Sequence, residues 1–237
     1  MSKVKEIAKM IDHSLLPPML TDDELKAGCE LALEYDVASV CIKPYAIPLA
    51  ARMLKGSDVL VGTVIGFPHG NSSVAVKVFE TEQACQDGAV EIDMVVNVGK
   101  VLSQAWDYVT EEIGAVLEAC HKNGAILKMI FENDYLKEDL YKIKLCEICS
   151  ELNVEYVKTS TGFGFVKGTD GHYGYDGATE TDVKLMRAHS APHVRVKAAG
   201  GIRTLDKVLL FQSLGATRIG ASATKTILEE AKARFGE

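Results

Sequence analysis

Short apolar segments alternate with amphipathic segments along the whole chain. The apolar segments have the length and β-branched content of strands, and they span 10–15, 38–44, 59–67, 91–97, 125–132, 155–161, 193–200 and 217–222. The amphipathic segments have helical periodicity, and they span 21–35, 47–54, 74–86, 108–121, 137–152, 179–189, 204–215 and 223–235. This alternation is typical of a parallel sheet made of βα units, and eight such units predict a single (β/α)8 barrel.

An open doubly wound sheet is the alternative fold. It would carry a G-x-G-x-x-G turn after its first strand, and the sequence has none at that place. No linker rich in Pro, Ser or charge divides the chain, so we expect one domain over residues 1–237. Thr21 precedes acidic residues at the start of its segment and is the expected N-cap of that helix.

Composition and charge narrow the class of protein. Hydrophobic residues make up 47% of the 237 residues, and the formal net charge is -7. A general nucleic-acid or membrane-surface binder needs a basic face, so neither partner is expected. The N-terminal residues lack the apolar core of a signal peptide, and no uncharged apolar run reaches bilayer length, so the expected location is cytoplasmic.

The cysteines are scattered through strand-like and helix-like segments without the spacing of metal ligands. They are Cys29, Cys41, Cys85, Cys120, Cys146 and Cys149. We interpret them as reduced and mostly buried thiols, and we expect no metal site. Cys146 and Cys149 share one face of a helical segment, which favours core packing over redox or zinc chemistry.

Candidate chemistry lies near the carboxyl ends of the predicted strands, where barrel enzymes carry their active sites. Strand alternation directs Asp93, Lys128, Lys158 and Lys197 toward the barrel interior. A buried ammonium is costly, and a neighbouring cation lowers its pKa further, so one lysine of a pair can serve as a neutral nucleophile. The residues alone leave open which lysine is the nucleophile, and inward ion pairs that only hold the barrel layers together are the alternative.

Two glycine-containing turns follow the seventh and eighth predicted strands, where this fold usually binds phosphate. Gly200 and Gly201 open GGIRT, and Gly220, Ala221 and Ser222 form GAS. Backbone amides at such turns and at the following helix starts are suited to an anion, although simple turn formation would also explain the glycines.

Eight motifs together resemble one known family. They are IDHSLL, VCIKP, GFPHGN, EIDMVVN, LKMIFE, YVKTSTGF, VKAAGGIRT and GAS, and they span nearly the whole chain. The chain resembles the deoxyribose-phosphate aldolases, which are class I, metal-free, Schiff-base-forming barrel enzymes. The resemblance implies reversible cleavage of 2-deoxy-D-ribose 5-phosphate to acetaldehyde and D-glyceraldehyde 3-phosphate, with no cofactor.

The resemblance also implies roles for individual residues. Lys158 corresponds to the Schiff-base lysine, Lys197 to the partner that lowers its pKa, and Asp93 to the carboxylate that transfers protons. The implied phosphate contacts are Gly162, Gly200, Gly201, Gly220, Ala221 and Ser222. Asp12, Cys41 and Lys128 are expected to line the site, and for Cys41 a small buried wall residue is the plain interpretation.

The chain departs from the family pattern in an insertion at about 163–178. Its glycines and aromatic residues suit a lid, although a surface extension is the alternative. The aromatic residues are Phe163, Phe165, Tyr173 and Tyr175, and two further residues of the insertion that could contact phosphate are Lys167 and His172.

Two further departures bear on proton transfer. Glu132-Asn133 replaces the usual Glu-Thr, and the C-terminal tyrosine of some members is missing. A related Schiff-base aldolase with another phosphorylated substrate, or a non-catalytic phosphosugar-binding barrel, remains an alternative. Self-association into a homodimer or a larger homo-oligomer is compatible with the fold.

Overall fold

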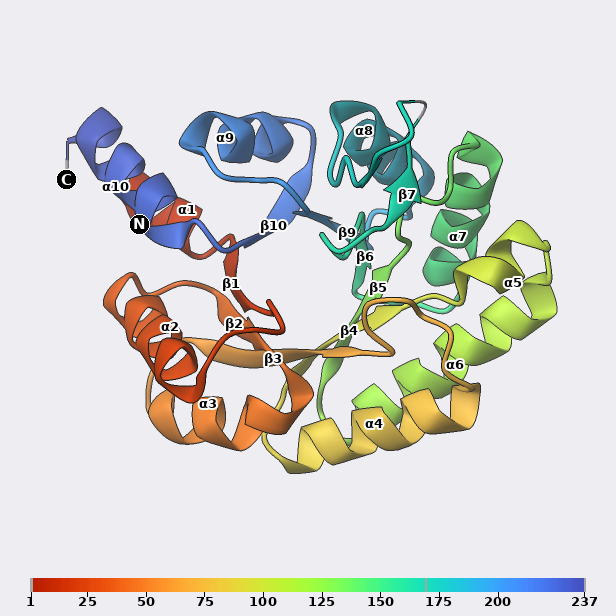
Figure 1. Cartoon of the computed structure of the whole chain (residues 1–237), viewed down its shortest axis with the longest axis horizontal. Helices are drawn as coiled ribbons and strands as arrows, with labels where there is room; N and C mark the ends of the chain where they lie inside the picture. Colours follow the sequence, from red (N-terminus) through yellow and green to blue (C-terminus); the bar gives the residue numbers. More distant parts are fainter. Residues whose placement is uncertain (1, 169, 237) are drawn as a thin grey trace.

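The computed structural model describes residues 2–168 and 170–236. Within these residues, eight parallel strands close into a barrel, and helices surround it (Figure 1). Closure is made by β1 (Ile11–Leu15) pairing with β10 (Ala216–Ala221). The predicted (β/α)8 barrel is therefore confirmed, and an open sheet is ruled out.

The strands follow one another around the barrel in chain order. The other barrel strands are β2 (Ser39–Ile42), β3 (Leu60–Ile65), β4 (Glu91–Val95), β5 (Ile126–Ile130), β6 (Tyr156–Lys158) and β9 (Arg195–Ala199). Their register pairs Ile130 with Lys158 and Lys158 with Lys197. Lys158 and Lys197 consequently lie at the same height, near the carboxyl ends of the strands.

Helices cover the outside of the barrel. They are α2 (Asp22–Glu34), α3 (Ile47–Met53), α4 (Val74–Gln86), α6 (Trp106–Lys122), α7 (Asp139–Glu151), α8 (Glu180–His189), α9 (Leu205–Ser213) and α10 (Thr224–Phe235). None of the helices in the described residues is both long enough and apolar enough to span a lipid bilayer.

The sequence pattern does not predict three shorter helical elements. They are α1 (Lys3–Ala8), α5 (Val98–Leu102) and the 3-10 helix η1 (Pro44–Ala46). Each is shorter than two turns of helix, which is too short for helical periodicity to stand out. Helix α1 packs beside α10, so the two ends of the chain lie close together (Figure 1).

Local capping explains where α2 begins. Thr21 Oγ1 accepts a hydrogen bond from the Glu24 backbone amide at 3.3 Å, and the Glu24 carboxylate accepts one from the Thr21 amide at 2.7 Å. These reciprocal bonds form a capping box, which satisfies two amides that the helix itself leaves free. The expected N-cap is confirmed.

Four of the five thiols on helices belong to the hydrophobic core, and the fifth, Cys85 on α4, is partly buried against it. Cys146 and Cys149 on α7 are fully buried, as are Cys29 on α2 and Cys120 on α6. Burial raises the pKa of Cys146 to about 12, which keeps this thiol protonated near neutral pH. The prediction of core packing for Cys146 and Cys149 is therefore confirmed.

A buried ion pair outside the barrel fixes the loop that follows β3. Lys77 on α4 donates to Glu112 on α6, to the Gly70 carbonyl and to the Val95 carbonyl, each at 2.7 Å. The second Glu112 oxygen accepts from the Asn97 amide at 2.9 Å. These bonds satisfy both charges and tie the GFPHGN loop to the end of β4.

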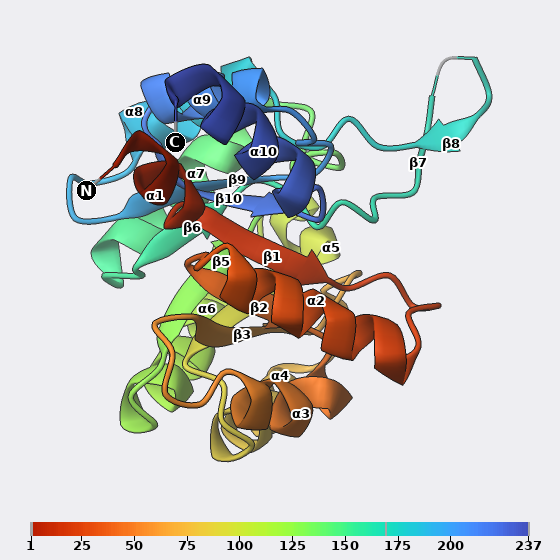
Figure 2. The ribbon, with the colours of Figure 1, turned by 90° about the vertical axis from the view of Figure 1, so that its left-hand side faces the viewer.

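The insertion forms a two-stranded antiparallel hairpin of β7 (Val166–Lys167) and β8 (Tyr173–Gly174). It extends away from the barrel beyond the ends of the strands (Figure 2). Its base is fixed by Asp134, whose carboxylate accepts from the amides of Asp176 and Gly177 at 2.5 and 3.1 Å. Residue 169, which falls within the predicted insertion, lies outside the described residues.

Candidate active site

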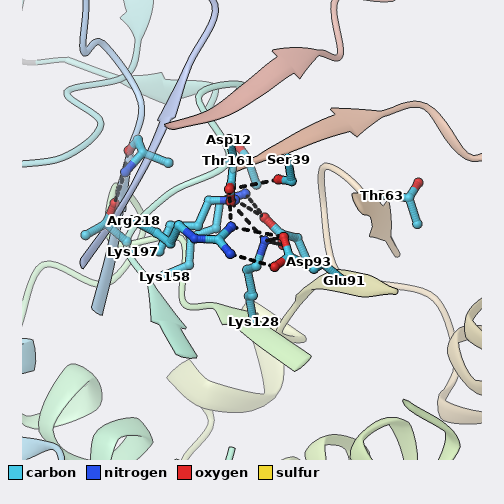
Figure 3. Close-up of polar contacts among 12 residues, drawn as sticks. Asp12, Ser39, Thr63, Glu91, Asp93, Lys128, Lys158, Thr161, Lys197 and Arg218 are labelled. Atoms are coloured by element: carbon cyan, nitrogen blue, oxygen red, sulfur yellow. Dashed lines mark hydrogen bonds and ion pairs between the residues drawn. The ribbon is translucent and has the colours of Figure 1, made fainter. Parts of the chain in front are cut away.

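Basic and acidic side chains from six different strands meet inside the barrel (Figure 3). The basic side chains are Lys128, Lys158, Lys197 and Arg218, and the carboxylates are Asp12, Glu91 and Asp93. Strand alternation places them all inward, as predicted for Asp93 and the three lysines. Because water is excluded, each of these charges depends on its partners for compensation.

Asp93 on β4 connects the two predicted catalytic lysines. Its Oδ2 atom lies 2.7 Å from Lys158 Nζ and 2.6 Å from Lys197 Nζ. All three side chains are almost fully buried. The structure thus brings together the three residues for which the sequence predicts a catalytic role.

A second set of ion pairs lies deeper in the barrel. Asp12 Oδ2 is 2.5 Å from Lys197 Nζ and 2.9 Å from Lys128 Nζ, and Lys128 Nζ is 2.6 Å from Glu91 Oε2. Arg218 on β10 bonds to Asp12 and to Glu91, in the latter case at 2.7 Å. Lys128 precedes by two residues the position that pairs with Lys158, which places it closer to the amino ends of the strands.

Asp12 and Lys128 do not border the cavity described below, and neither do Asp93 and Lys197, so the expectation that Asp12 and Lys128 line the site stays a prediction. Asp12 and Lys128 are partners of Lys197 and Asp93, so they fix the charges on which Lys158 depends.

The three lysines of the cluster differ in pKa because their surroundings differ. Burial lowers the pKa of the Lys158 amine, and although Asp93 opposes this effect, Lys197 adds to it. Burial would also lower the pKa of Lys197, but the attraction of Asp12 and Asp93 outweighs it and raises that pKa. For Lys128 three carboxylates outweigh burial and raise the pKa well above its usual value. Lys158 is therefore the lysine of this cluster that gives up its proton most readily.

Lys158 borders an open cavity of about 260 Å³ at the carboxyl ends of the strands. Its other walls are Ser14, Leu16, Pro17, Thr161, Gly162, Phe163, Tyr175, Ala199, Gly200, Gly201, Ile202, Arg203, Gly220, Ala221 and Ser222. All six residues predicted to contact phosphate lie along this cavity. The Lys158 side chain and two glycine-containing turns thus border the same space.

Gly200 shows why the first of these turns requires glycine. Its φ is +97°, and a Cβ there would lie 2.8 Å from the Cα of Gly177. A side chain would therefore clash with the base of the hairpin as well as strain the backbone. The Gly200 carbonyl accepts a hydrogen bond from the Ala178 amide at 3.2 Å, which joins the hairpin to this turn.

Sequence comparison identifies the family. The sequence model of the DeoC/LacD family aldolases matches residues 6–229. The deoxyribose-phosphate aldolase of Rhodopirellula baltica is 52% identical over 231 residues, which cover 98% of this chain and 91% of that protein. The chain belongs to the DeoC/LacD aldolase family. It is an aldolase, and hence a lyase.

Two further relatives agree with this assignment. The deoxyribose-phosphate aldolase of Caldanaerobacter subterraneus subsp. tengcongensis is 48% identical over 227 residues, covering 95% of this chain and 94% of that protein. The structure of the deoxyribose phosphate aldolase from Aeropyrum pernix, described as a tetramer, superposes with a TM-score of 0.86 at 26% identity. That alignment covers 98% of this chain and 93% of the other.

An apolar cluster closes one side of the aldolase cavity. Cys41 and Val64 are buried there against Leu16, Phe67 and Phe163. Burial raises the pKa of Cys41 to about 11, and the nearby Asp93 charge contributes to this rise. Cys41 is therefore a small, buried and protonated thiol packed behind Leu16 and Phe163, which border the cavity.

The hairpin contributes to the cavity through its base. Phe163 and Tyr175 line the cavity, whereas the rings of Phe165 and Tyr173 stack on each other at 4.2 Å, on the exposed part of the hairpin. Lys167 and His172 lie around a separate hollow on the hairpin and do not border the cavity. The aldolase hairpin thus shapes the cavity at its base and projects away from it, rather than covering it as a lid.

Asn133, one of the departures from the family pattern, faces away from the cavity. Its side-chain amide lies 3.5 Å from Met186 Sδ on α8, and its backbone amide donates to the Thr159 carbonyl at 3.0 Å. The replacement therefore places no additional polar side chain beside Lys158 of the aldolase.

Sequence reasoning missed two groups that complete the charged cluster. Arg218 shares a strand face with Gly220, so its inward direction could have been inferred from the TRIGAS motif. Ser39 Oγ donates to Asp12 Oδ1 at 2.8 Å, and a single serine in a strand carries no such signal. Among the described residues, no group of three or more His, Cys, Asp or Glu has the arrangement of a metal site.

Proposed function

We propose that this aldolase cleaves 2-deoxy-D-ribose 5-phosphate reversibly to acetaldehyde and D-glyceraldehyde 3-phosphate through a Schiff base on Lys158. The observation that supports this most directly is the contrast among the buried basic groups. Lys158 borders the cavity and has a lowered pKa, whereas Lys128, Lys197 and Arg218 have raised pKa values. A neutral amine facing the cavity is what attack on an aldehyde requires.

In this mechanism the Lys158 amine attacks the C1 aldehyde of the open-chain sugar, and loss of water leaves an iminium ion. The iminium accepts the electron pair of the C2–C3 bond while the C3 hydroxyl loses its proton, and D-glyceraldehyde 3-phosphate departs. Protonation of the enamine at C2 and hydrolysis then release acetaldehyde and regenerate the amine.

Asp93 and Lys197 are the residues suited to these proton transfers. Their functional groups are 2.6 Å apart, and Asp93 also contacts the reacting nitrogen of Lys158. Burial alone would raise the pKa of Asp93, but the charges of Lys128, Lys158 and Lys197 together outweigh burial and lower it. Asp93 therefore stays ionised and can accept a proton when the charge of Lys158 changes.

The phosphate is assigned to the turns at Gly200–Gly201 and Gly220–Ser222, which both line the cavity, and the second of these turns directly precedes α10. Ser222→Asp places a negative charge at this turn, and we expect it to raise KM for deoxyribose 5-phosphate roughly 10-fold by repulsion. Cleavage of unphosphorylated 2-deoxyribose provides the control, since its kcat/KM should be almost unchanged. An equal effect on both sugars would argue against a phosphate site here.

The decisive experiment for the function is cleavage of deoxyribose 5-phosphate, followed by the release of acetaldehyde. A related phosphorylated substrate is the second candidate, because Tyr175 and Phe163 of the inserted hairpin narrow the cavity. Comparing deoxyribose 5-phosphate with other phosphorylated deoxy sugars separates the two. Failure to cleave any of them would instead favour a phosphosugar-binding barrel.

Self-association and location are also proposals. The relative from Aeropyrum pernix is described as a tetramer. On this basis we propose that the aldolase forms a homo-oligomer, which sedimentation measurements would test. We likewise propose the cytoplasmic location that the sequence predicts, which fractionation of the cells that produce the protein would test.

A further inference from the structure

Glu132 is a buried carboxylate that the mechanism above leaves without a role. It follows β5 directly, at the end of the barrel where the cavity opens, and it is 1% exposed. Its φ is +59°, a left-handed conformation that costs free energy for a residue with a side chain. The surrounding contacts must therefore hold it in place.

Those contacts are made almost entirely by Thr161. Glu132 Oε1 accepts from the Thr161 backbone amide at 3.2 Å, and Oε2 accepts from the Thr161 hydroxyl. The same hydroxyl oxygen accepts from the Phe163 amide at 2.9 Å. A hydroxyl has one hydrogen and two lone pairs, so its hydrogen and one lone pair are already used.

The remaining lone pair of Thr161 is available to the cavity, which this residue lines together with Lys158. Thr161 follows Lys158 by three residues and directly precedes Gly162, a proposed phosphate contact. Along the chain Thr161 therefore stands between the residue assigned to the reacting carbon and a residue assigned to the phosphate, and all three line the cavity. The group of deoxyribose 5-phosphate that lies between its reacting carbon and its phosphate is the C4 hydroxyl.

We infer that Glu132 is a positioning residue that accepts a hydrogen bond from the Thr161 hydroxyl. The Thr161 oxygen is thereby left as a hydrogen-bond acceptor for the C4 hydroxyl of the substrate. In the direction of addition, this arrangement selects acceptor aldehydes that carry the same hydroxyl. The inference rests on the proposed function and adds a basis for its substrate selectivity. A hydroxyl that donates to a carboxylate is polarised and accepts a hydrogen bond more strongly. An acceptor aldehyde without the hydroxyl leaves this buried acceptor unpaired.

Protonation of Glu132 would reverse this arrangement. Burial raises the pKa of Glu132 to about 7. The hydrogen bonds from Thr161 and the charge of Lys158 on β6 oppose this rise, whereas the charge of Asp134 in the following loop adds to it. Below that pKa the carboxylic acid donates to Thr161, whose own hydrogen then turns toward the cavity. Glu132→Gln imposes the same reversal at every pH, because its Oε1 pairs with the Thr161 amide and its Nε2 donates to the hydroxyl.

The test measures addition of acetaldehyde to two acceptors, D-glyceraldehyde 3-phosphate and 3-oxopropyl phosphate, which lacks the hydroxyl. We expect Glu132→Gln to reduce the wild-type preference for the hydroxylated acceptor about 10-fold in kcat/KM. Thr161→Val should do the same, the double variant should lose no more than either single variant, and Thr161→Ser should keep the preference. Thermal unfolding checks that each variant is folded.

A second measurement needs no variant. The preference of the wild type should increase as pH rises through about 7, where Glu132 becomes ionised, and Glu132→Gln should show no such increase. An unchanged preference in Glu132→Gln, or independent effects in the double variant, would overturn the inference. Its failure is distinct from failure of the proposed function, in which the wild type itself would not cleave deoxyribose 5-phosphate.

Discussion

The Lys158→Arg variant should lose roughly 10⁴-fold or more in kcat for cleavage of deoxyribose 5-phosphate, because the reacting amine is removed. Arginine stays protonated at any pH in which the protein is folded, so it cannot attack an aldehyde. It does keep a positive charge beside Asp93, which lies 2.7 Å from Lys158 Nζ in the wild type. The variant therefore separates the loss of a nucleophile from the loss of an ion pair.

Borohydride trapping gives a second readout for Lys158. Incubation of the wild type with acetaldehyde and borohydride should leave an ethyl adduct on the peptide that contains Lys158, and mass mapping should find none in Lys158→Arg. Lys167→Arg is the matched control, because Lys167 lies on the hairpin outside the cavity and should leave both activity and adduct unchanged. Near-equal rates for wild type and Lys158→Arg would remove the central assignment.

The charge balance of the barrel interior explains why Lys158, rather than another lysine, should react. Four basic groups share this space with the three carboxylates of Asp12, Glu91 and Asp93. One basic group is therefore left without a full countercharge, and an uncompensated buried charge is unstable. Lys197 contacts two carboxylates and Lys128 contacts three, whereas Lys158 contacts Asp93 alone within this cluster.

The barrel could be predicted from the sequence because the same pattern, an apolar strand followed by an amphipathic helix, occurs eight times. The limits of α4 (Val74–Gln86) match the prediction, since Ser73 stands as the N-cap before the helix and Gly88, with a positive φ, follows its end. The catalytic lysines could be placed inward because strand alternation fixes the direction of every second side chain. Which lysine is neutral could not be predicted, because that depends on contacts between strands far apart in the chain, such as Lys197 with Asp12.

The sequence also did not predict how deep an inward-facing residue lies within the barrel. Lys128 shares the inward face with Asp93, Lys158 and Lys197, yet it lies two residues closer to the amino end of its strand than Ile130, the partner of Lys158. Depth depends on the register between neighbouring strands, which the alternation of side chains does not specify. The hairpin is a similar case, because its composition indicates a flexible loop but not the direction in which it projects.

Removing the charge of Lys197 should make Lys158 harder to deprotonate. In Lys197→Met the like charge that helps lower the Lys158 pKa is gone, and Asp93 is left to stabilise the Lys158 ammonium. Because the neutral amine is the reactive form, a higher pKa means less of it at neutral pH, by about 10-fold per pKa unit. With loss of the proton donor, we expect kcat/KM at neutral pH to fall roughly 100-fold.

The pH profile distinguishes this electrostatic role from a structural one. The rising limb of kcat/KM reports deprotonation of Lys158 in the free enzyme, so it should move to higher pH in Lys197→Met. Lys197→Arg keeps the positive charge near Asp12 and Asp93, and its rising limb should stay near that of the wild type. If both variants lose activity with an unchanged rising limb, Lys197 does not set the protonation of Lys158, and burial alone must lower that pKa.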